Sequence, residues 1–328
     1  MKIGVVGCGA LGSYYGAKLS RDGQEVHFLL RSDFEAVRRR GLFVRSPEGD
    51  FHINPKCARQ PEQIGVCDVV LIGLKTTAND QFRHLLPPLV DEHTALVTLQ
   101  NGLGNEEQLA QIFHSKQILG GLCFVCLNRV EPGVIQHLAH GKIVLGEFSS
   151  WPEPRTHDIA SAIRHAGVPC DVTDNLERAH WEKLVWNIPF NGLGVASAAG
   201  YDAIQSGAMK PGDAIGDCLP TDQLLGDPRW ETIVRELMLE VIRAANALGF
   251  KIAESLADFQ IERTRAMGRY RASTLIDFER RQPLELTALF LEPLRRAQMA
   301  RIDMPRLKAL CEVLEQLEQW RARQRQEN

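Results

Sequence analysis

The sequence predicts an α/β domain over residues 1–174 followed by an all-α domain over residues 175–328. In the first part, short apolar runs of the kind found in buried parallel strands alternate with helical patterns. In the second part these short runs stop, and long segments repeat apolar residues at helical spacing. A chain of 328 residues also exceeds the usual size of one hydrophobic core. We therefore expect two domains of different class.

Apolar runs in the first part are expected to be strands. They span residues 2–6, 25–30, 68–74, 94–99, 121–127, 142–145 and 170–173, with a helix over residues 159–167 before the last run. In the second part, the apolar spacing predicts helices over residues 233–248, 284–298 and 305–320. The first of these should end at Gly249, because glycine is common directly after a helix.

The first strand is followed by the stretch Gly7-Cys8-Gly9-Ala10-Leu11-Gly12, and a helical pattern begins at once. Strand, glycine turn and helix are the context of a Rossmann-type dinucleotide-binding domain. In that motif the first glycine permits a tight turn, the second admits a pyrophosphate and the third allows close helix packing. The helix N-terminus then attracts the anion. We predict that this turn binds a dinucleotide; a glycine turn without a ligand is the alternative.

The residue at the end of the second strand indicates which dinucleotide is bound. Enzymes that use NAD usually place Asp or Glu there to bind the ribose 2′-hydroxyl. This chain has Arg31, whose guanidinium favours a 2′-phosphate by charge and by its fork of donors. Asp33 is expected to cap the helix that begins near residue 34. We predict NADP(H) as the cofactor; an ordinary surface charge is the alternative for Arg31.

Polar residues also follow two later strands, at the edge where doubly wound sheets bind ligands. Lys75 comes directly after the run 68–74, and Gln100 and Asn101 come directly after the run 94–99. A further helix is expected to begin near residue 105. Both loops therefore belong to the ligand-binding edge of the predicted sheet.

Charge and apolar patterning exclude several kinds of partner. The formal net charge of -3 argues against nucleic acid or an anionic membrane. The arginine clusters at residues 38–40 and 321–325 are short and are expected to be solvated helix surface. No window is long or apolar enough to span a bilayer, and the first residues lack a signal-peptide pattern. We expect a cytoplasmic protein with a small-molecule partner.

The eight cysteines are scattered, which favours reduced thiols over a disulfide framework. Cys123 and Cys126 have CxxC spacing, but strand positions three apart face opposite sides of a sheet. No second cysteine or histidine pair completes a zinc site. We interpret this pair as part of the core and expect no metal.

Lys183, Asn187 and Asn191 follow one another at steps of four and share one face of a helix. An amine and two amides on one face suit a ligand with a carboxylate and a carbonyl, and the lysine could protonate an oxygen that gains charge. The alternative is a solvated lysine with asparagines in a helix–helix contact. Pro189 lies inside the stripe and is expected to kink the helix, which affects the alignment of Asn191.

These motifs occur in an order that resembles the ketopantoate reductases (2-dehydropantoate 2-reductases) over nearly the whole chain. The matching positions are the turn 7–12 with Arg31, Leu74-Lys75-Thr76, residues 100–107, residues 132–137 with 146–148, Trp181 with Lys183, Asn187 and Asn191, and Ser273 with Asp277 and Glu285. The resemblance implies reduction of 2-dehydropantoate to pantoate by NADPH, a step towards pantothenate and coenzyme A. It also implies a helical domain like that of 6-phosphogluconate dehydrogenase, serving substrate binding and homodimer formation.

The resemblance also implies roles for individual residues. Lys183 matches the general acid that protonates the developing alkoxide, and Glu285 matches the carboxylate that binds the substrate hydroxyl. Lys75 and Asn101 match positions near the nicotinamide, and Arg31 matches the reader of the 2′-phosphate. The positions that match substrate contacts are Asn101, Asn187, Asn191 and Ser273.

Beside Pro189 inside the stripe, two features depart from the family pattern. Glu285 is followed by Leu286-Thr287 where the family has Ile-Asp, and residues 201–218 form an extra glycine-rich segment, either a lid or a surface loop. These departures concern the substrate and leave the class of reaction unchanged. The alternatives are therefore a reductase of another 2-keto acid on the same scaffold, or a protein that senses NADP(H) without catalysis.

Overall fold

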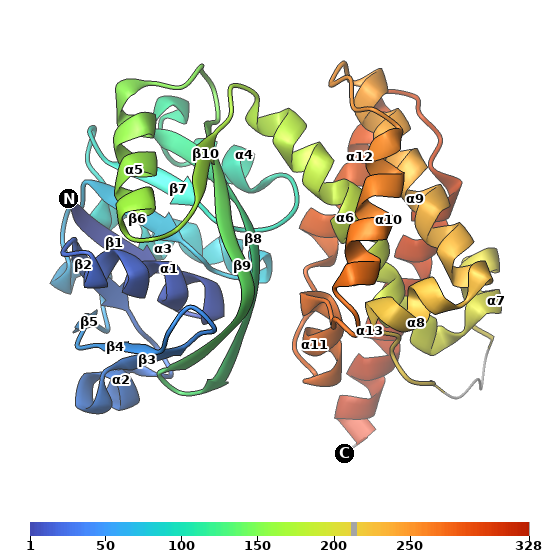
Figure 1. Cartoon of the computed structure of the whole chain (residues 1–328), viewed down its shortest axis with the longest axis horizontal. Helices are drawn as coiled ribbons and strands as arrows, with labels where there is room; N and C mark the ends of the chain where they lie inside the picture. Colours follow the sequence, from blue (N-terminus) through green and yellow to red (C-terminus); the bar gives the residue numbers. More distant parts are fainter. Residues whose placement is uncertain (211–214, 328) are drawn as a thin grey trace. The chain divides into compact units, whose positions relative to one another are not determined.

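The computed structural model describes residues 1–210 and 215–327 (Figure 1). The chain divides into two compact units, Met1–Ala179 and His180–Asn328. The boundary falls inside helix α6 (Leu176–Ala196) because the first turn of this helix belongs to the first unit. A Cβ added at Gly120 of the sheet would lie 2.8 Å from the Leu176 side chain. The border at residue 174 precedes this helix and stays a prediction.

Six parallel strands form the centre of the sheet in the first unit. They are β1 (Lys2–Val6), β2 (Glu25–Leu29), β5 (Lys56–Ala58), β6 (Val69–Ile72), β7 (Ala95–Thr98) and β8 (Ile118–Glu131). Their order across the sheet is β5-β2-β1-β6-β7-β8, and every neighbouring pair is parallel. In chain order this is the 3-2-1-4-5-6 arrangement of a dinucleotide-binding sheet, with its switch point between β1 and β6. The predicted α/β class is confirmed.

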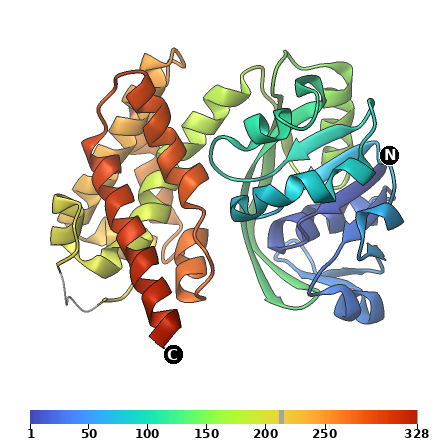
Figure 2. The same ribbon diagram turned by 180° about the vertical axis from the view of Figure 1, so that it is seen from behind.

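Alternate residues along these strands pack on opposite faces of the sheet. The helices that cover the faces are α1 (Ala10–Arg21), α5 (Pro154–His165), α3 (Phe82–Leu85) and α4 (Asn105–Ala110). Val5 and Leu71 pack with α1 and α5 in one apolar cluster, whereas Val6 and Ile72 pack with α3 and α4 in another. Figure 1 shows the face of the sheet that carries α1 and α5, and Figure 2 shows the opposite face, which carries α3 and α4. Burial on both faces explains the continuous apolar runs.

The outer part of the sheet is a long hairpin with short strands beside it. Strand β8 turns at Pro132-Gly133 into β9 (Val134–Glu147), so both strands are longer than the runs 121–127 and 142–145 predicted from the sequence. The remaining strands are β3 (Leu42–Arg45), β4 (Phe51–Ile53) and β10 (Cys170–Val172). Strands β3, β4 and β5 were not expected, because each mixes apolar with charged or polar residues and forms no continuous apolar run.

Every element described in the second unit is helical, as its sequence predicts. After α6 come α7 (Tyr201–Ser206), α8 (Thr221–Gly226), α9 (Pro228–Ala247), α10 (Ser255–Ala266), α11 (Ser273–Glu279), α12 (Glu292–Met299) and α13 (Pro305–Glu327). Helix α9 ends just before Gly249, whose φ is 96°. Helix α6 packs closely on α13, since a Cβ at Gly192 would lie 2.5 Å from Leu310. Figure 2 shows α13 along the length of this unit.

Two predicted segments of this unit differ in the structure. The single helix expected over residues 284–298 begins later, and the π-helix Thr287–Leu291 precedes α12. This wide turn lies directly before Pro293, which has no N–H to donate to a regular helix. The extra segment 201–218 begins with α7, and Met209 donates its backbone N–H to Gln316 of α13 at 2.8 Å. Residues 211–214 of that segment lie outside the described residues.

The expectation that residues 321–325 are solvated is wrong for Arg321. Its side chain is buried, and it donates to the carbonyls of Phe278 at 2.9 Å and Gln282 at 2.6 Å. The guanidinium also lies 4.8 Å from the centre of the Phe278 ring. Arg321 therefore holds the C-terminal end of α11, because that face of α13 packs inside the unit.

Glu240 of α9 holds the beginning of α13. Its buried carboxylate accepts the backbone N–H groups of Arg306 at 2.9 Å and Leu307 at 3.0 Å. These groups lie in the first turn of α13, where no intrahelical acceptor exists. Burial raises the pKa of Glu240 above its ordinary value of 4.5.

We expect Glu240→Gln to change the pH dependence of stability. Because the pKa of Glu240 is raised in the folded chain, the folded state binds more protons than the unfolded state between about pH 4.5 and this raised pKa. The free energy of unfolding of the wild type should therefore fall relative to that of Glu240→Gln as the pH rises through this range. Urea unfolding at a series of pH values measures the difference.

Glu254→Gln is the matched control, because Glu254 is exposed on the same unit. Its unfolding curves should follow those of the wild type at every pH. Parallel pH profiles for the wild type and Glu240→Gln would contradict the prediction.

Candidate active site

The predicted glycine turn lies at the switch point of the sheet. Gly7 follows β1 with φ of 94°, and a Cβ there would lie 2.2 Å from the backbone nitrogen of Leu74. A Cβ at Gly12 would lie 2.4 Å from the Gly7 carbonyl oxygen, and one at Gly73 would lie 3.0 Å from the same atom. The ends of β1 and β6 and the first turn of α1 therefore pack backbone against backbone. Gly73 is a fourth glycine of this contact, and the GxGxxG pattern does not include it.

Gly9, in contrast, has open space beside it. A Cβ added at Gly9 would meet no atom within 4 Å. Gly9 is the N-cap of α1, where no side chain caps the helix and no acidic residue lies in the first turn. The first backbone N–H groups of a helix have no intrahelical acceptor, so the turn with Ala10 and Leu11 fits the pyrophosphate of a dinucleotide.

Cys8 lies inside the same turn and remains a neutral thiol. Its Sγ lies 3.4 Å from the carbonyl oxygen of Val5, to which it donates. Burial, with Cys57 and Asp33 nearby, raises the pKa of Cys8 far above its ordinary value. A protonated thiol adds no negative charge to a turn that would hold a pyrophosphate.

Arg31 is exposed directly beyond β2, and Asp33 faces the interior. The carboxylate of Asp33 accepts from Arg129 at 2.9 Å and from the Gly133 N–H at 3.2 Å. Asp33 occupies the N-cap position of α2 (Phe34–Arg40), but its side chain makes no capping hydrogen bond. The predicted cap is therefore wrong, because the carboxylate is held by the β8–β9 hairpin. Because these partners hold the Asp33 carboxylate, it is not available to bind a ribose hydroxyl.

A buried chain of side-chain amides connects the loops that carry Lys75 and Asn101. Its members are Gln100, Asn79 and Asn105, which we call the amide relay. Gln100 donates to the Leu74 carbonyl at 3.0 Å, and Asn105 donates to the Asn101 carbonyl at 3.1 Å. Sequence reasoning noted Gln100 in a motif but assigned no role to the relay. The signal that could have found it is the polar run Gln100 to Asn105 directly after a buried strand.

The polar stripe of the second unit lies on α6, which continues through Pro189. Asn187 and Asn191 are buried, and Lys183 is half-buried. Asn191 Oδ1 accepts the Ser273 hydroxyl at 3.3 Å and the Thr274 N–H at 3.1 Å. The structure thus brings Asn191 and Ser273 together, and Asn191 supplies the cap that α11 lacks from its own Ala272. The alternative interpretation of the asparagines was a helix–helix contact, and Asn191 makes such a contact between α6 and α11.

Glu285 lies between α11 and the π-helix and is 7% exposed. Its backbone carbonyl accepts the N–H of Leu289 at 3.2 Å, which joins it to the start of the wide turn. Thr287, at the point where the chain departs from the family pattern, is the first residue of that π-helix. π-Helical turns are often found at functional sites.

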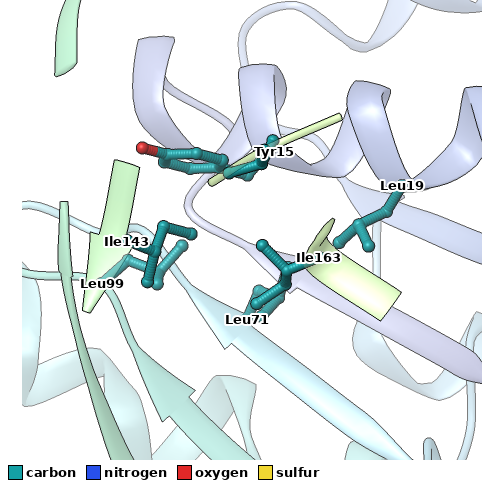
Figure 3. A pocket seen from close by; sticks show the side chains of 7 residues that line it. Tyr15, Leu19, Leu71, Leu99, Ile143 and Ile163 are labelled. Carbon is teal, nitrogen blue, oxygen red and sulfur yellow. The ribbon is translucent and has the colours of Figure 1, made fainter. Parts of the chain in front are cut away.

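The first unit contains a small cavity (Figure 3). It lies between α1, α5 and the sheet, and its walls are apolar. The residues that line it are Tyr15, Leu19, Leu71, Leu99, Ile143, Ile163 and Val168. Tyr15 donates its hydroxyl to the Gly141 carbonyl at 3.1 Å, so its polar end is satisfied within the protein. We interpret the cavity as a packing gap of the core.

Two kinds of site are absent from the part of the chain that the structure describes. No group of three or more His, Cys, Asp or Glu side chains is arranged to hold a metal ion. Among the same residues, no helix combines the length and apolar character that a membrane crossing requires. All eight cysteines are free thiols, and Cys123 and Cys126 are buried in β8.

Known proteins resemble both units. Residues 3–150 match the family model described as "Ketopantoate reductase PanE/ApbA", and residues 175–318 match its C-terminal model. The chain belongs to the ketopantoate reductase family. A 2-dehydropantoate 2-reductase of Nostoc sp. is 38% identical over 97% of this chain and 95% of its own length.

Solved structures of ketopantoate reductase family members have the same fold. The 2-dehydropantoate 2-reductase of Geobacter metallireducens has a TM-score of 0.88 and 47% identity, covering 96% of this chain and 99% of its own. That of Methylococcus capsulatus has a TM-score of 0.86 and 30% identity, with 98% of each chain covered. The similarity therefore extends over both units.

We expect Gly9→Ala to weaken dinucleotide binding while leaving the fold intact. The new methyl group has room in the structure, so the melting temperature should stay the same or rise slightly. The same methyl group would occupy the space that a pyrophosphate needs, and the dissociation constant for NADPH should rise by about tenfold or more. Quenching of protein fluorescence on titration with NADPH measures this constant.

Gly226→Ala is the control, because a Cβ at Gly226 in the helical unit also meets no atom within 4 Å. Its affinity for NADPH should equal that of the wild type. Gly12→Ala should differ from both, since its Cβ meets the Gly7 carbonyl and destabilises the fold. Unchanged NADPH affinity in Gly9→Ala would place the dinucleotide elsewhere.

Proposed function

We propose that this chain is an NADPH-dependent 2-dehydropantoate 2-reductase, which reduces 2-dehydropantoate (ketopantoate) to pantoate in the synthesis of pantothenate and coenzyme A. The observation that carries the proposal is its full-length similarity to proteins named for this activity, at 38% and 47% identity. The enzyme is an oxidoreductase that acts on CH–OH groups. The presence of Lys183 and Glu285 argues against a sensor without catalysis.

The choice of NADP(H) over NAD(H) rests on Arg31 and Asp33. Arg31 is exposed directly beyond β2, where a guanidinium can bind a ribose 2′-phosphate through two charge-assisted hydrogen bonds. The nearby carboxylate of Asp33 is buried and accepts from Arg129. It therefore does not act as the acidic residue that selects NAD, and it does not repel the phosphate.

The two parts of the chain have different tasks in this proposal. Residues 1–174 bind the dinucleotide through Gly7, Cys8, Gly9, Ala10, Leu11, Gly12, Arg31, Lys75 and Asn101. Residues 175–328 bind the keto acid and form the contact of a homodimer. The free thiols of all eight cysteines suit a reducing, cytoplasmic setting.

Reduced nicotinamide supplies the hydride that adds to the keto carbon, and this chain supplies the proton and the orientation. A lysine ammonium carries a proton at neutral pH. Lys183 donates that proton to the keto oxygen as negative charge develops there, so its effect is largest in the transition state. The product is a 2-hydroxy acid, and water returns the proton to Lys183.

The other polar groups of the helical unit orient the keto acid. Asn191 accepts with Oδ1 from Ser273 and Thr274, which leaves Nδ2 as the atom that donates to a carboxylate or carbonyl. Asn187 and Ser273 supply further hydrogen bonds to the substrate, as does Asn101 of the first unit. Glu285 binds the substrate hydroxyl through its carboxylate.

We expect the purified protein to oxidise NADPH in the presence of ketopantoate and to lose this activity in Lys183→Ala. Loss of a positioned general acid lowers kcat by about 10²- to 10⁴-fold. Absorbance of NADPH measures turnover, with ketopantoate tested beside a panel of other 2-keto acids. Lys308→Ala is the control, because Lys308 is an exposed lysine of the same unit.

Each outcome of this assay separates the candidate functions. Turnover of another 2-keto acid alone would keep the chemistry and replace the substrate. Tight NADPH binding without turnover of any acid would refute the reductase.

We expect Arg31→Ala to lower the preference for NADPH over NADH. Loss of hydrogen bonds to a charged phosphate should raise the KM for NADPH by about tenfold to a hundredfold. The KM for NADH should change little, because NADH has no 2′-phosphate. Steady-state kinetics with both dinucleotides measure the ratio. Arg39→Ala on α2 is the control, and an equal change for both dinucleotides would contradict the role of Arg31.

A further inference from the structure

We propose that Asn79 is a positioning residue that holds Lys75 and Asn101 in place for hydride transfer through the amide relay. This inference rests on the proposed function for its catalytic meaning. The hydrogen-bond partners of Asn79 are the side chains of Gln100 and Asn105.

The relay is a continuous line of hydrogen bonds between two main-chain carbonyls. Gln100 Nε2 donates to the Leu74 carbonyl at 3.0 Å and to Asn79 Oδ1 at 2.7 Å. Asn79 Nδ2 donates to Asn105 Oδ1 at 3.0 Å, and Asn105 Nδ2 donates to the Asn101 carbonyl at 3.1 Å. The line therefore begins one residue before Lys75 and ends at Asn101 itself.

The direction of donation along the relay is fixed. Thr98 Oγ1 donates to Gln100 Oε1 at 3.0 Å, so the Gln100 amide presents its nitrogen to Asn79. Reversal of the Asn79 amide would place nitrogen against nitrogen at Gln100 and oxygen against oxygen at Asn105. Both ends of the relay are carbonyls, which only accept. One arrangement of the amides satisfies all of these groups.

Burial makes this single arrangement costly to break. Asn79 is 9% exposed, Gln100 is 5% and Asn105 is 1%. A buried amide that loses its partner keeps the desolvation cost of the unpaired group, so fully satisfied networks rigidify their surroundings. Asn79 is the central member, and its removal interrupts the relay while leaving both terminal bonds in place.

The relay begins where the hydrogen bonds between β6 and β7 end. The ladder between β6 and β7 ends at the pair Ile72 and Thr98, followed by one bond from the Leu99 N–H to the Ile72 carbonyl at 2.8 Å. Beyond that point residues 73–75 and 100–104 form neither strand nor helix, while Asn79 lies in the 3-10 helix Thr76–Gln81 and Asn105 is the first residue of α4. Peptide groups are planar, so fixing the Leu74 and Asn101 carbonyls fixes the peptide planes beside the Lys75 and Asn101 side chains.

The effect on catalysis should be on geometry and not on affinity. The pyrophosphate contacts of the glycine turn do not involve the relay, and they supply much of the binding of a dinucleotide. Hydride transfer requires reacting atoms in near-attack geometry, where a misplacement of 1 Å can cost about 10²-fold in rate. A looser pair of loops therefore lowers kcat before it changes the dissociation constant for NADPH.

The experiment compares Asn79→Ala with Thr94→Val in the full-length protein. Thr94 lies just before β7, at the opposite end of that strand from the relay, and donates a buried hydrogen bond to the Cys67 carbonyl at 2.7 Å. Both substitutions therefore remove buried hydrogen bonds near the ends of β7, but only Asn79→Ala interrupts the relay. Asn105→Asp is a second variant that keeps the shape of residue 105 but cannot donate to the Asn101 carbonyl.

For Asn79→Ala and Asn105→Asp we expect kcat to fall by about tenfold or more, with the dissociation constant for NADPH within about threefold of wild type. The primary isotope effect of deuterated NADPH on kcat should rise, because hydride transfer becomes the slow step. Thr94→Val should match the wild type in all three measurements. Equal kinetics of the relay variants and Thr94→Val would overturn the proposal.

Hydrogen exchange of the protein without dinucleotide tests the relay independently of turnover. The backbone amides of residues 74–79 and 101–105 should exchange faster in Asn79→Ala and Asn105→Asp than in the wild type or Thr94→Val. Unchanged exchange in these two segments would overturn the positioning role whatever the substrate is. A wild type that does not reduce ketopantoate, with faster exchange in the relay variants, would instead refute the proposed substrate and retain the relay.

Discussion

The contact on which the first unit depends is the approach of three glycine backbones at the switch point of the sheet. Gly7, Gly12 and Gly73 leave no room for a Cβ on any of them, and Gly73 also donates its N–H to the Val6 carbonyl at 2.8 Å. This contact fixes the start of α1 against the ends of β1 and β6. Next to this contact, Gly9 leaves open space at the N-terminus of α1.

The glycine contact is connected to the loops that follow β6 and β7. Gly73 leads to Leu74, whose carbonyl accepts from Gln100, and the amide relay carries the connection to Asn101. The glycine turn, the Lys75 loop and the Asn101 loop are thus one connected piece of structure within the first unit. A dinucleotide that binds the turn would meet loops whose backbone is already fixed, which favours near-attack geometry for hydride transfer.

How much the sequence could predict depends on whether a signal was local. The turn at residues 7–12, the buried strands and the long helices are encoded by neighbouring residues, and the structure has them. Arg321 and Asp33 were misjudged because their partners, at Phe278 and Arg129, lie far away in the chain. The π-helix before α12 was missed for a related reason, since apolar spacing does not distinguish it from an α-helix.

The helical unit shows how buried polar residues serve architecture and site together. Helix α11 is held at its start by Asn191 of α6 and at its end by Arg321 of α13. Ser273 is the first residue of that helix, and Glu285 follows the segment that Arg321 holds. A substrate-binding role for Ser273 and Glu285 therefore requires these two distant anchors as much as the side chains themselves. Because Asn191 Oδ1 is committed to α11, its structural bond also decides which of its atoms faces a ligand.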